Sequence, residues 1–275
     1  MSMELGEKQR EWRLDNIRAI LIFLVVLGHL LPTYANGYRG HLYQVIFSFH
    51  MAVFVFLNGA HARFDRKKIL KHYIWPYLFF QVLYYYFYVF ILNEKIELQF
   101  LTPFYSLWYL MTVTFYLAAI PLFRTTNRKH AILALCVSLA CTILIGFDNT
   151  AGNYLSLSRT IVFLPFFLLG LYREVLFDEK GKEKLKGKLP LAVCMAMLLM
   201  LEAVLVIVNV SPTILRMNQG YGSFWDILLR LATLFLGLLW FFVLLRVVPN
   251  RSIPILTRIG QNTMPVYLLH GFLSI

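Results

Sequence analysis

An arginine and a histidine, Arg18 and His29, lie in the first long apolar segment of the chain with ten residues between them. Eleven helical steps make almost three turns, so both side chains would share one face, about 16 Å apart along the axis. Asp15 precedes Arg18 by one turn on nearly the same face. A neutral imidazole can take a proton from a hydroxyl near pH 7, and a guanidinium can bind an anion or stabilise developing charge. The spacing therefore suits proton transfer beside an anionic group.

Each of these three residues also has a purely structural interpretation. A histidine inside a membrane helix can bond to a neighbouring helix, and Arg18 can be a basic anchor at the membrane edge. Asp15 either orients Arg18 or caps the helix N-terminus. The alignment of all three on one face favours a catalytic site made of His29, Arg18 and Asp15.

The composition predicts an all-α, polytopic transmembrane helix bundle. Apolar residues make up 59% of the 275, against about 45–50% in soluble domains, and the mean hydropathy is +0.66. Stretches of about 20 apolar residues predict nine spans. They lie near 17–36, 41–60, 72–92, 104–123, 131–147, 156–172, 189–210, 224–246 and 262–275. The ninth is short and reaches the terminus, which indicates a truncated chain or an unusual last segment.

Basic residues alternate between the predicted loops and give the orientation. All but five of the 26 lysines and arginines fall on one side if the N-terminus is cytoplasmic; the five are Arg39, Lys95, Arg159, Arg216 and Arg230. We therefore expect a multi-pass protein of the cell inner (plasma) membrane, with the lipid bilayer as its surroundings. Basic cytoplasmic loops also account for the formal charge of +12, so no nucleic-acid partner is expected. No spacing of ligands indicates a metal site.

The loop after the second span is richer in charge than orientation requires. Arg63, Arg66, Lys67 and Lys68 are followed by Lys71 within the same short stretch. Arginine and lysine at this density are suited to the phosphates of a nucleotide-like donor. The alternative is a plain basic loop, and no phosphate-binding glycine motif accompanies it.

Further polar and aromatic residues fall where an acceptor or a polar cavity would be. They are Asn58, Trp108, Tyr109, Arg159 and His270. Trp108 and Tyr109 either belong to an interfacial belt or stack on a sugar ring. Arg159 enters its span from the outer side and would contact an acceptor or an acyl carbonyl. His270 either shares a polar cavity with His29 or is a bonded core histidine, and Arg230 has Asp226 one turn before it as a possible ion-pair partner.

The chain resembles the acyltransferase-3 family of integral-membrane acyltransferases, and within it the fucose 4-O-acetylase-like branch. The segments that carry the resemblance are 13–29, 49–59, 66–70, 76–77, 107–110, 159–170 and 260–270. The resemblance implies a ten-helix bundle, so 1–275 is expected to be a single membrane-embedded acyltransferase domain that lacks its C-terminal helix. It assigns the essential roles to His29 and Arg18, with the basic loop as a donor contact. The family usually has serine where this chain has Asn58, which leaves no hydroxyl at that position.

The expected function is that of a membrane O-acyltransferase. Acetyl-CoA would be the donor substrate, and the acceptor would be a hydroxyl of a sugar in a cell-envelope or exported glycan, with His29 acting directly or through a covalent acyl relay. A transporter or flippase for a glycan or lipid-linked sugar is the alternative, because it would use the same polar cavity with its histidines as a proton relay. A non-catalytic membrane scaffold is the third interpretation.

Overall fold

The computed structural model describes residues 11–31, 38–177, 188–208, 210 and 212–274. Within these ranges the chain forms only helices and connecting loops, without a strand. Parts of the predicted basic segments, including residues 1–10 and 178–187, lie outside the described residues.

Seven helices and one composite helix form the body of the bundle. The seven are α1 (Trp12–Leu30), α2 (Tyr38–Ala60), α5 (Trp108–Phe123), α6 (Arg128–Leu144), α7 (Leu157–Leu171), α10 (Lys188–Val208) and α12 (Phe224–Val247). The composite helix consists of α3 (Arg66–Ile69), the π-helix η2 (Leu70–Ile74), α4 (Trp75–Tyr86) and the π-helix η3 (Phe87–Ile91).

Short helices connect these elements or end the chain. Three are 3₁₀ turns: η4 (Tyr105–Leu107), η5 (Ile145–Phe147) and η6 (Tyr154–Ser156). The others are α8 (Arg173–Leu176), α11 (Pro212–Leu215), α13 (Pro254–Gln261), α14 (Thr263–Leu269) and α15 (Gly271–Ser274).

Seven helices among the described residues are long and apolar enough to cross a membrane, which makes the chain a multi-pass membrane protein. Helix α1 is not among the seven because Arg13, Asp15 and Arg18 all fall within its 19 residues. The predicted last span, 262–275, is divided into α14 and α15 and is preceded by α13, which the sequence pattern did not predict. The prediction of nine or ten spans therefore stays a prediction.

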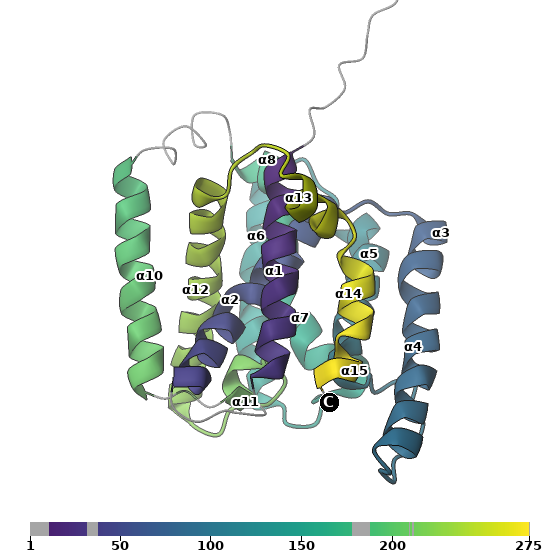
Figure 1. Cartoon of the computed structure of the whole chain (residues 1–275). Coiled ribbons are helices and arrows are strands. Elements are labelled where there is room, and N and C mark those ends of the chain that lie inside the picture. The colour runs from purple at the N-terminus through teal and green to yellow at the C-terminus, as the bar shows by residue number, and fades with distance from the viewer. Residues whose placement is uncertain (1–10, 32–37, 178–187, 209, 211, 275) are drawn as a thin grey trace, which may run out of the picture.

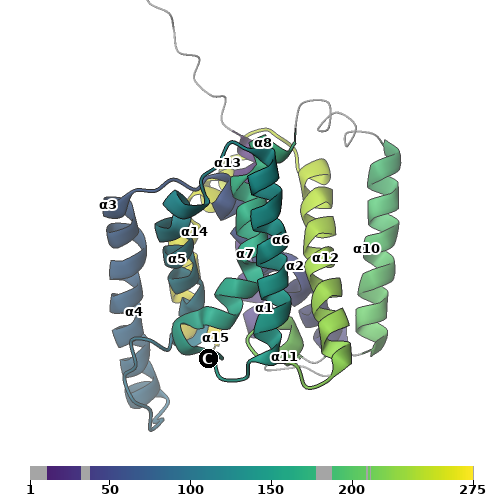
Figure 2. The ribbon, with the colours of Figure 1, turned by 180° about the vertical axis from the view of Figure 1, so that it is seen from behind.

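The bundle has two faces at which the helices end (Figure 1). Helices α8 and α13 lie at the face where α1 begins, called here the N-terminal face, and α11 and α15 lie at the opposite face. Helix α10 and the composite helix lie at the two flanks, as the view from behind also shows (Figure 2). Helix α1 lies between these flanks, in contact with α2, α13 and α14.

Two glycines bring the C-terminal ends of α2 and α7 into backbone contact. A Cβ atom at Gly59 would lie 2.0 Å from the Phe167 carbonyl oxygen, and one at Gly170 would lie 2.2 Å from the Phe56 carbonyl oxygen. Only glycine permits such an approach, so the two helices depend on both glycines for this contact.

Helix α13 fixes the beginning of α1. The Asn16 side-chain amide donates to the carbonyl oxygens of Pro249 (3.2 Å) and Arg251 (3.0 Å), and its oxygen accepts from the Thr257 hydroxyl (2.7 Å). A Cβ at Gly260 would lie 1.8 Å from the Asp15 carbonyl oxygen, so the two helices touch. This packing holds Asp15 and Arg18 in place at the N-terminal face.

Candidate functional site

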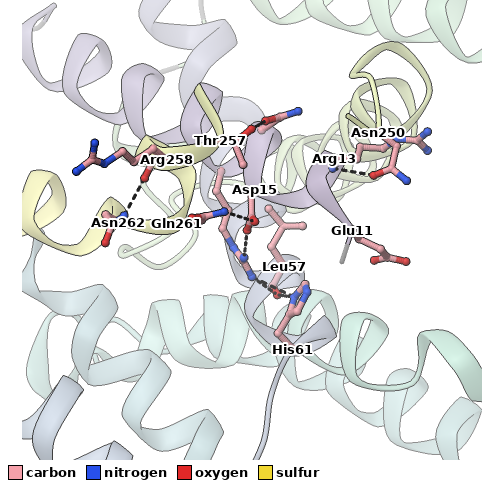
Figure 3. A network of polar contacts seen from close by, with 12 residues as sticks. Glu11, Arg13, Asp15, Leu57, His61, Asn250, Thr257, Arg258, Gln261 and Asn262 are labelled. Carbon is pink, nitrogen blue, oxygen red and sulfur yellow. Dashed lines mark hydrogen bonds and ion pairs between the residues drawn. The ribbon is translucent and has the colours of Figure 1, made fainter. Parts of the chain in front are cut away.

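Arg18 is held by an ion pair on its own helix. Its Nη1 lies 3.1 Å from the Asp15 carboxylate, whose other oxygen accepts from Gln261 at 3.3 Å (Figure 3). Helix α1 begins after Glu11, so Asp15 is not its N-cap. Of the two roles considered for Asp15, the structure therefore shows the one in which it orients Arg18.

The other side of the guanidinium faces the end of α2. Arg18 Nη2 lies 3.0 Å from His61 Nδ1 and 3.4 Å from the Leu57 carbonyl oxygen (Figure 3). His61 Nδ1 also lies 3.0 Å from the Leu57 carbonyl oxygen, so this nitrogen faces a donor in Arg18 and an acceptor in Leu57. Burial, and next the charge of Arg18, lower the pKa of His61 from its ordinary value. The sequence pattern did not single out His61, because nothing local marks it as a partner of Arg18.

These residues line a cavity of about 390 Å³ that we call the inner cavity. Its polar lining includes Arg18, Asn58, His61, Arg63, Lys68 and Tyr109. Two of the four predicted donor-binding residues are thus brought to Arg18. The other two, Arg66 and Lys67, are exposed and lie outside the lining.

Asn58 and Tyr109 meet in the same cavity. The Asn58 side-chain amide donates to the Tyr109 hydroxyl across α2 and α5. Tyr109 therefore lines a different cavity from Trp108, its ring neighbour at 5.9 Å, with which it was predicted to contact the acceptor. Its place is on the Arg18 side of the bundle.

His29 lies at the other end of α1, in a chain of hydrogen bonds. Its Nδ1 is 2.9 Å from the Tyr105 hydroxyl, which is 2.8 Å from the Ser274 hydroxyl. Ser274 donates in turn to the His270 carbonyl oxygen at 3.1 Å. Tyr105 and Ser274 were not predicted from the sequence.

The direction of this chain defines the tautomer of His29. The Ser274 hydroxyl donates its hydrogen bond to a carbonyl oxygen, so it must accept the hydrogen bond that Tyr105 donates. The Tyr105 oxygen is then the acceptor for the hydrogen bond from His29 Nδ1. In this arrangement Nδ1 carries the proton and Nε2 keeps its lone pair. An imidazole oriented in this way by its second nitrogen is suited to act as a general base.

His29 belongs to a second cavity, the outer cavity, of about 370 Å³. Its polar and aromatic lining includes His29, Tyr43, His50, Tyr105, Trp108, Arg159 and Arg216. The Arg159 guanidinium lies over the Trp108 ring at 4.6 Å and its Nε donates to the Arg216 carbonyl oxygen at 3.0 Å. The structure thus places Trp108 and Arg159 in the same cavity as His29, and their predicted contact with an acceptor stays a prediction.

The His270 ring packs against the His29 ring. The two ring centroids are 5.1 Å apart, and His270 Nδ1 donates to the Tyr267 carbonyl oxygen at 2.6 Å. His270 is 3% exposed and is not part of the cavity lining. Of the two interpretations of His270, the structure shows the bonded core histidine, which packs against His29 without lining its cavity.

The two cavities meet at one wall. Val25, Met51 and Tyr267 line both of them. Arg18 and His29 therefore face two chambers on either side of three side chains, and a small group passing between the chambers would have to pass these three.

A family model described as an acyltransferase domain, that of the acyltransferase-3 family, matches residues 11–275. The chain belongs to the acyltransferase-3 family. No curated protein and no solved structure gives a match. The family and the long apolar helices together make the protein a membrane acyltransferase.

Two further sequence expectations for this acyltransferase concern an ion pair between Arg230 and Asp226 and the absence of a metal site. Arg230 makes no ion pair with Asp226; it donates instead to the carbonyl oxygens of Gln219 (2.7 Å) and Thr142 (3.4 Å). The Asp226 carboxylate accepts from backbone amides at the start of α12 and caps that helix. Within the described residues, no three histidine, cysteine, aspartate or glutamate side chains converge as metal ligands would.

Proposed function

We propose that this membrane acyltransferase moves an acetyl group from acetyl-CoA to a sugar hydroxyl of a cell-envelope or exported glycan. The observation that carries the proposal is the pair of cavities along α1. One contains Arg18 among basic side chains, the other contains His29 with its Nδ1 bonded to Tyr105, and they share a wall. A donor and an acceptor entering from opposite faces would meet at this wall.

The inner cavity fits the anionic part of an acyl-CoA. Arg18, Arg63 and Lys68 line it, and the exposed Arg66 and Lys67 follow on the same loop. Charge-assisted hydrogen bonds from such groups are the usual means of holding phosphates. Acyl-CoA is a cytoplasmic metabolite, so the N-terminal face is assigned to the cytoplasm and the membrane to the cell inner (plasma) membrane, in agreement with the positive-inside rule.

The outer cavity fits a sugar hydroxyl. Trp108 and Tyr43 offer aromatic surface, and Arg159 and Arg216 offer donors. The resemblance to the fucose 4-O-acetylase-like branch also favours a sugar acceptor. Metal ligation plays no part in the proposal.

The proposed reaction balances with the groups present. The acceptor hydroxyl oxygen attacks the thioester carbonyl carbon, and His29 Nε2 takes the hydroxyl proton. The new C–O ester bond forms, the C–S bond breaks, and the proton passes from His29 to the departing thiolate. Arg18 holds an anionic part of the donor, and the shared wall of Val25, Met51 and Tyr267 favours a group as small as acetyl.

The test compares envelope glycans from cells that carry wild-type protein, His29→Ala or the control His130→Ala. His130 is exposed at the start of α6, away from both cavities. Mass spectrometry should find an acetyl addition in wild type and control, and a loss of about 10²–10⁴-fold in rate for His29→Ala with the protein still in the membrane. Full activity of His29→Ala would overturn the assignment. A glycan that crosses the membrane without acetylation, and without acetyl-CoA consumption, would favour the transporter alternative.

A further inference from the structure

A third cavity, of about 570 Å³, opens at the same face as the outer cavity. It lies between the loop 149–153, the segment 214–222 and the start of α12. Side-chain amides dominate its polar lining, with Asn149, Asn153, Asn218 and Gln219 beside Tyr221 and Arg230. The proposed reaction does not use this cavity.

The third cavity continues into the outer cavity through a pair of asparagines. Asn153 and Asn218 line both, and the Asn218 amide donates to the Asn153 side-chain oxygen at 3.2 Å. A ligand that occupies the outer cavity can therefore extend past this pair without entering the membrane core.

The walls of the third cavity are well defined by packing. Arg230 is 4% exposed, lies over the Tyr221 ring at 4.4 Å and is held by two backbone carbonyl oxygens. A Cβ at Gly146 would lie 2.1 Å from the Tyr221 ring, and one at Gly220 would lie 2.1 Å from the Asn149 side-chain oxygen. Both glycines are thus needed for the aromatic ring and the amide to lie where they do.

The chemistry of the lining favours a neutral, hydroxyl-rich ligand. Side-chain amides both donate and accept, which matches the hydroxyl groups of a sugar, and a tyrosine ring can pack on its apolar face. The two charged residues, Arg230 and Asp226, are of opposite sign and are already bonded to backbone groups. The cavity therefore lacks the uncompensated charge that an ionic ligand would require.

We infer that this cavity is a second glycan subsite, and that the acceptor is a chain of at least two linked sugars. The sugar to be acylated lies at His29 in the outer cavity, and its neighbour passes the Asn153–Asn218 pair into the third cavity. The inference rests on the proposed function, because it takes the acceptor to be a glycan. It adds that the enzyme selects acceptors by length.

The experiment uses purified full-length protein, radiolabelled acetyl-CoA and envelope glycan released by mild acid from the cells that produce it. The fragments are separated into single sugars and chains of two to four units. The double variant Asn149→Ala/Gln219→Ala removes two exposed amides that line the third cavity alone. The control, Gln99→Ala, removes an exposed amide outside the cavities described above.

Wild type and control should show a kcat/KM that rises about tenfold from one sugar to two, as expected from two added hydrogen bonds. The double variant should acetylate single sugars at the wild-type rate and lose this rise. A wild-type rate that is independent of chain length, or a variant with the wild-type rise, would overturn the inference while leaving the proposed function intact. Transfer by wild type to no fragment at all would contradict the proposed function itself.

Discussion

The His29 imidazole and the Tyr105 hydroxyl are hydrogen-bonded at 2.9 Å, although 76 positions separate them in the chain. Tyr105 has a positive φ of 45°, which is uncommon for a residue other than glycine. Its hydroxyl connects His29 to Ser274 and so to a main-chain carbonyl oxygen. A strained tyrosine that fixes one nitrogen of a candidate base is best explained as a positioning residue.

Tyr105→Phe removes the acceptor for His29 Nδ1 and keeps the ring contact. We expect kcat to fall about 10–100-fold with KM for acetyl-CoA nearly unchanged, because the imidazole is no longer held in one tautomer. The pH profile of kcat should shift as well, which a purely structural role would not produce. Tyr86→Phe, at a half-exposed tyrosine of α4 away from the cavities, is the control. An unchanged kcat in Tyr105→Phe would contradict the role given to this residue.

Arg18→Lys keeps the charge and loses the simultaneous contacts with Asp15 and His61. Loss of one charge-assisted hydrogen bond costs about 1.5–3 kcal/mol, so KM for acetyl-CoA should rise by about 10–100-fold. Steady-state kinetics in reconstituted membranes measure this change, with the exposed Arg128→Lys as control. A fall in kcat with unchanged KM would show that Arg18 stabilises the transition state instead of binding the donor.

The pKa of His61 predicts a pH dependence of donor binding. Burial and the charge of Arg18 lower this pKa from the ordinary 6.5, while Arg173 lowers and Glu11 and the Leu57 carbonyl raise it to a smaller degree. A lowered pKa means that His61 is neutral at pH 7 and takes up a proton only below 6.5. Protonated His61 adds a positive charge to the cavity proposed for the donor's phosphates, so acetyl-CoA affinity should rise as the pH falls below that range.

His61→Asn tests this dependence, because the asparagine side-chain oxygen can accept from Arg18 and takes up no proton. The variant should bind acetyl-CoA like wild type at pH 7 and lack the rise in affinity that wild type shows as the pH falls through the lowered pKa of His61. Isothermal titration over the pH range provides the comparison. The same rise in His61→Asn and in wild type would assign it to another group.

Short-range features of the site could be predicted from the sequence. Asp15 and Arg18 are three residues apart on one helix, so their ion pair follows from helical geometry. The connection of His29 with Trp108 and Arg159 follows from their common depth in a bundle of alternating spans. The stretches of about 20 apolar residues likewise predicted the helical class of the fold.

Contacts between distant segments could not be predicted in this way. Gln261 reaches Asp15 from 246 positions away, and it does so through α13, a short helix whose place on α1 depends on Asn16 and Gly260. Tyr105 lies in a 3₁₀ turn, for which apolar periodicity carries no signal. Trp108 and Tyr109 are adjacent in the chain and face different cavities, which only the rotation of α5 in the bundle decides.

The wall between the cavities gives a prediction that separates donor binding from transfer. Met51→Phe places a larger side chain where Met51 lines both cavities, and the residue is only partly buried, so the change is tolerable. We expect acetyl-CoA to bind with wild-type affinity while kcat for transfer falls at least about tenfold, because the thioester no longer approaches His29. Met51→Leu conserves the volume and should behave like wild type. Equal kcat values for the two variants would mean that the acetyl group does not pass this wall.

The close contact between α2 and α7 predicts that a larger residue at Gly59 lowers the stability of the protein. A Cβ at Gly59 would lie 2.0 Å from a main-chain oxygen of α7, which no rotation of a side chain can relieve. Gly59→Ala should therefore move α2 away from α7 at an overpacking cost of about 1–3 kcal/mol and lower the Tm in detergent by several degrees. Gly222→Ala meets its nearest neighbour at 3.5 Å, an ordinary contact, and should leave the Tm unchanged. Since Asn58 and His61 lie at the same end of α2, Gly59→Ala should also weaken acetyl-CoA binding; a variant with lowered Tm and intact binding would show that the inner cavity does not depend on this helix contact.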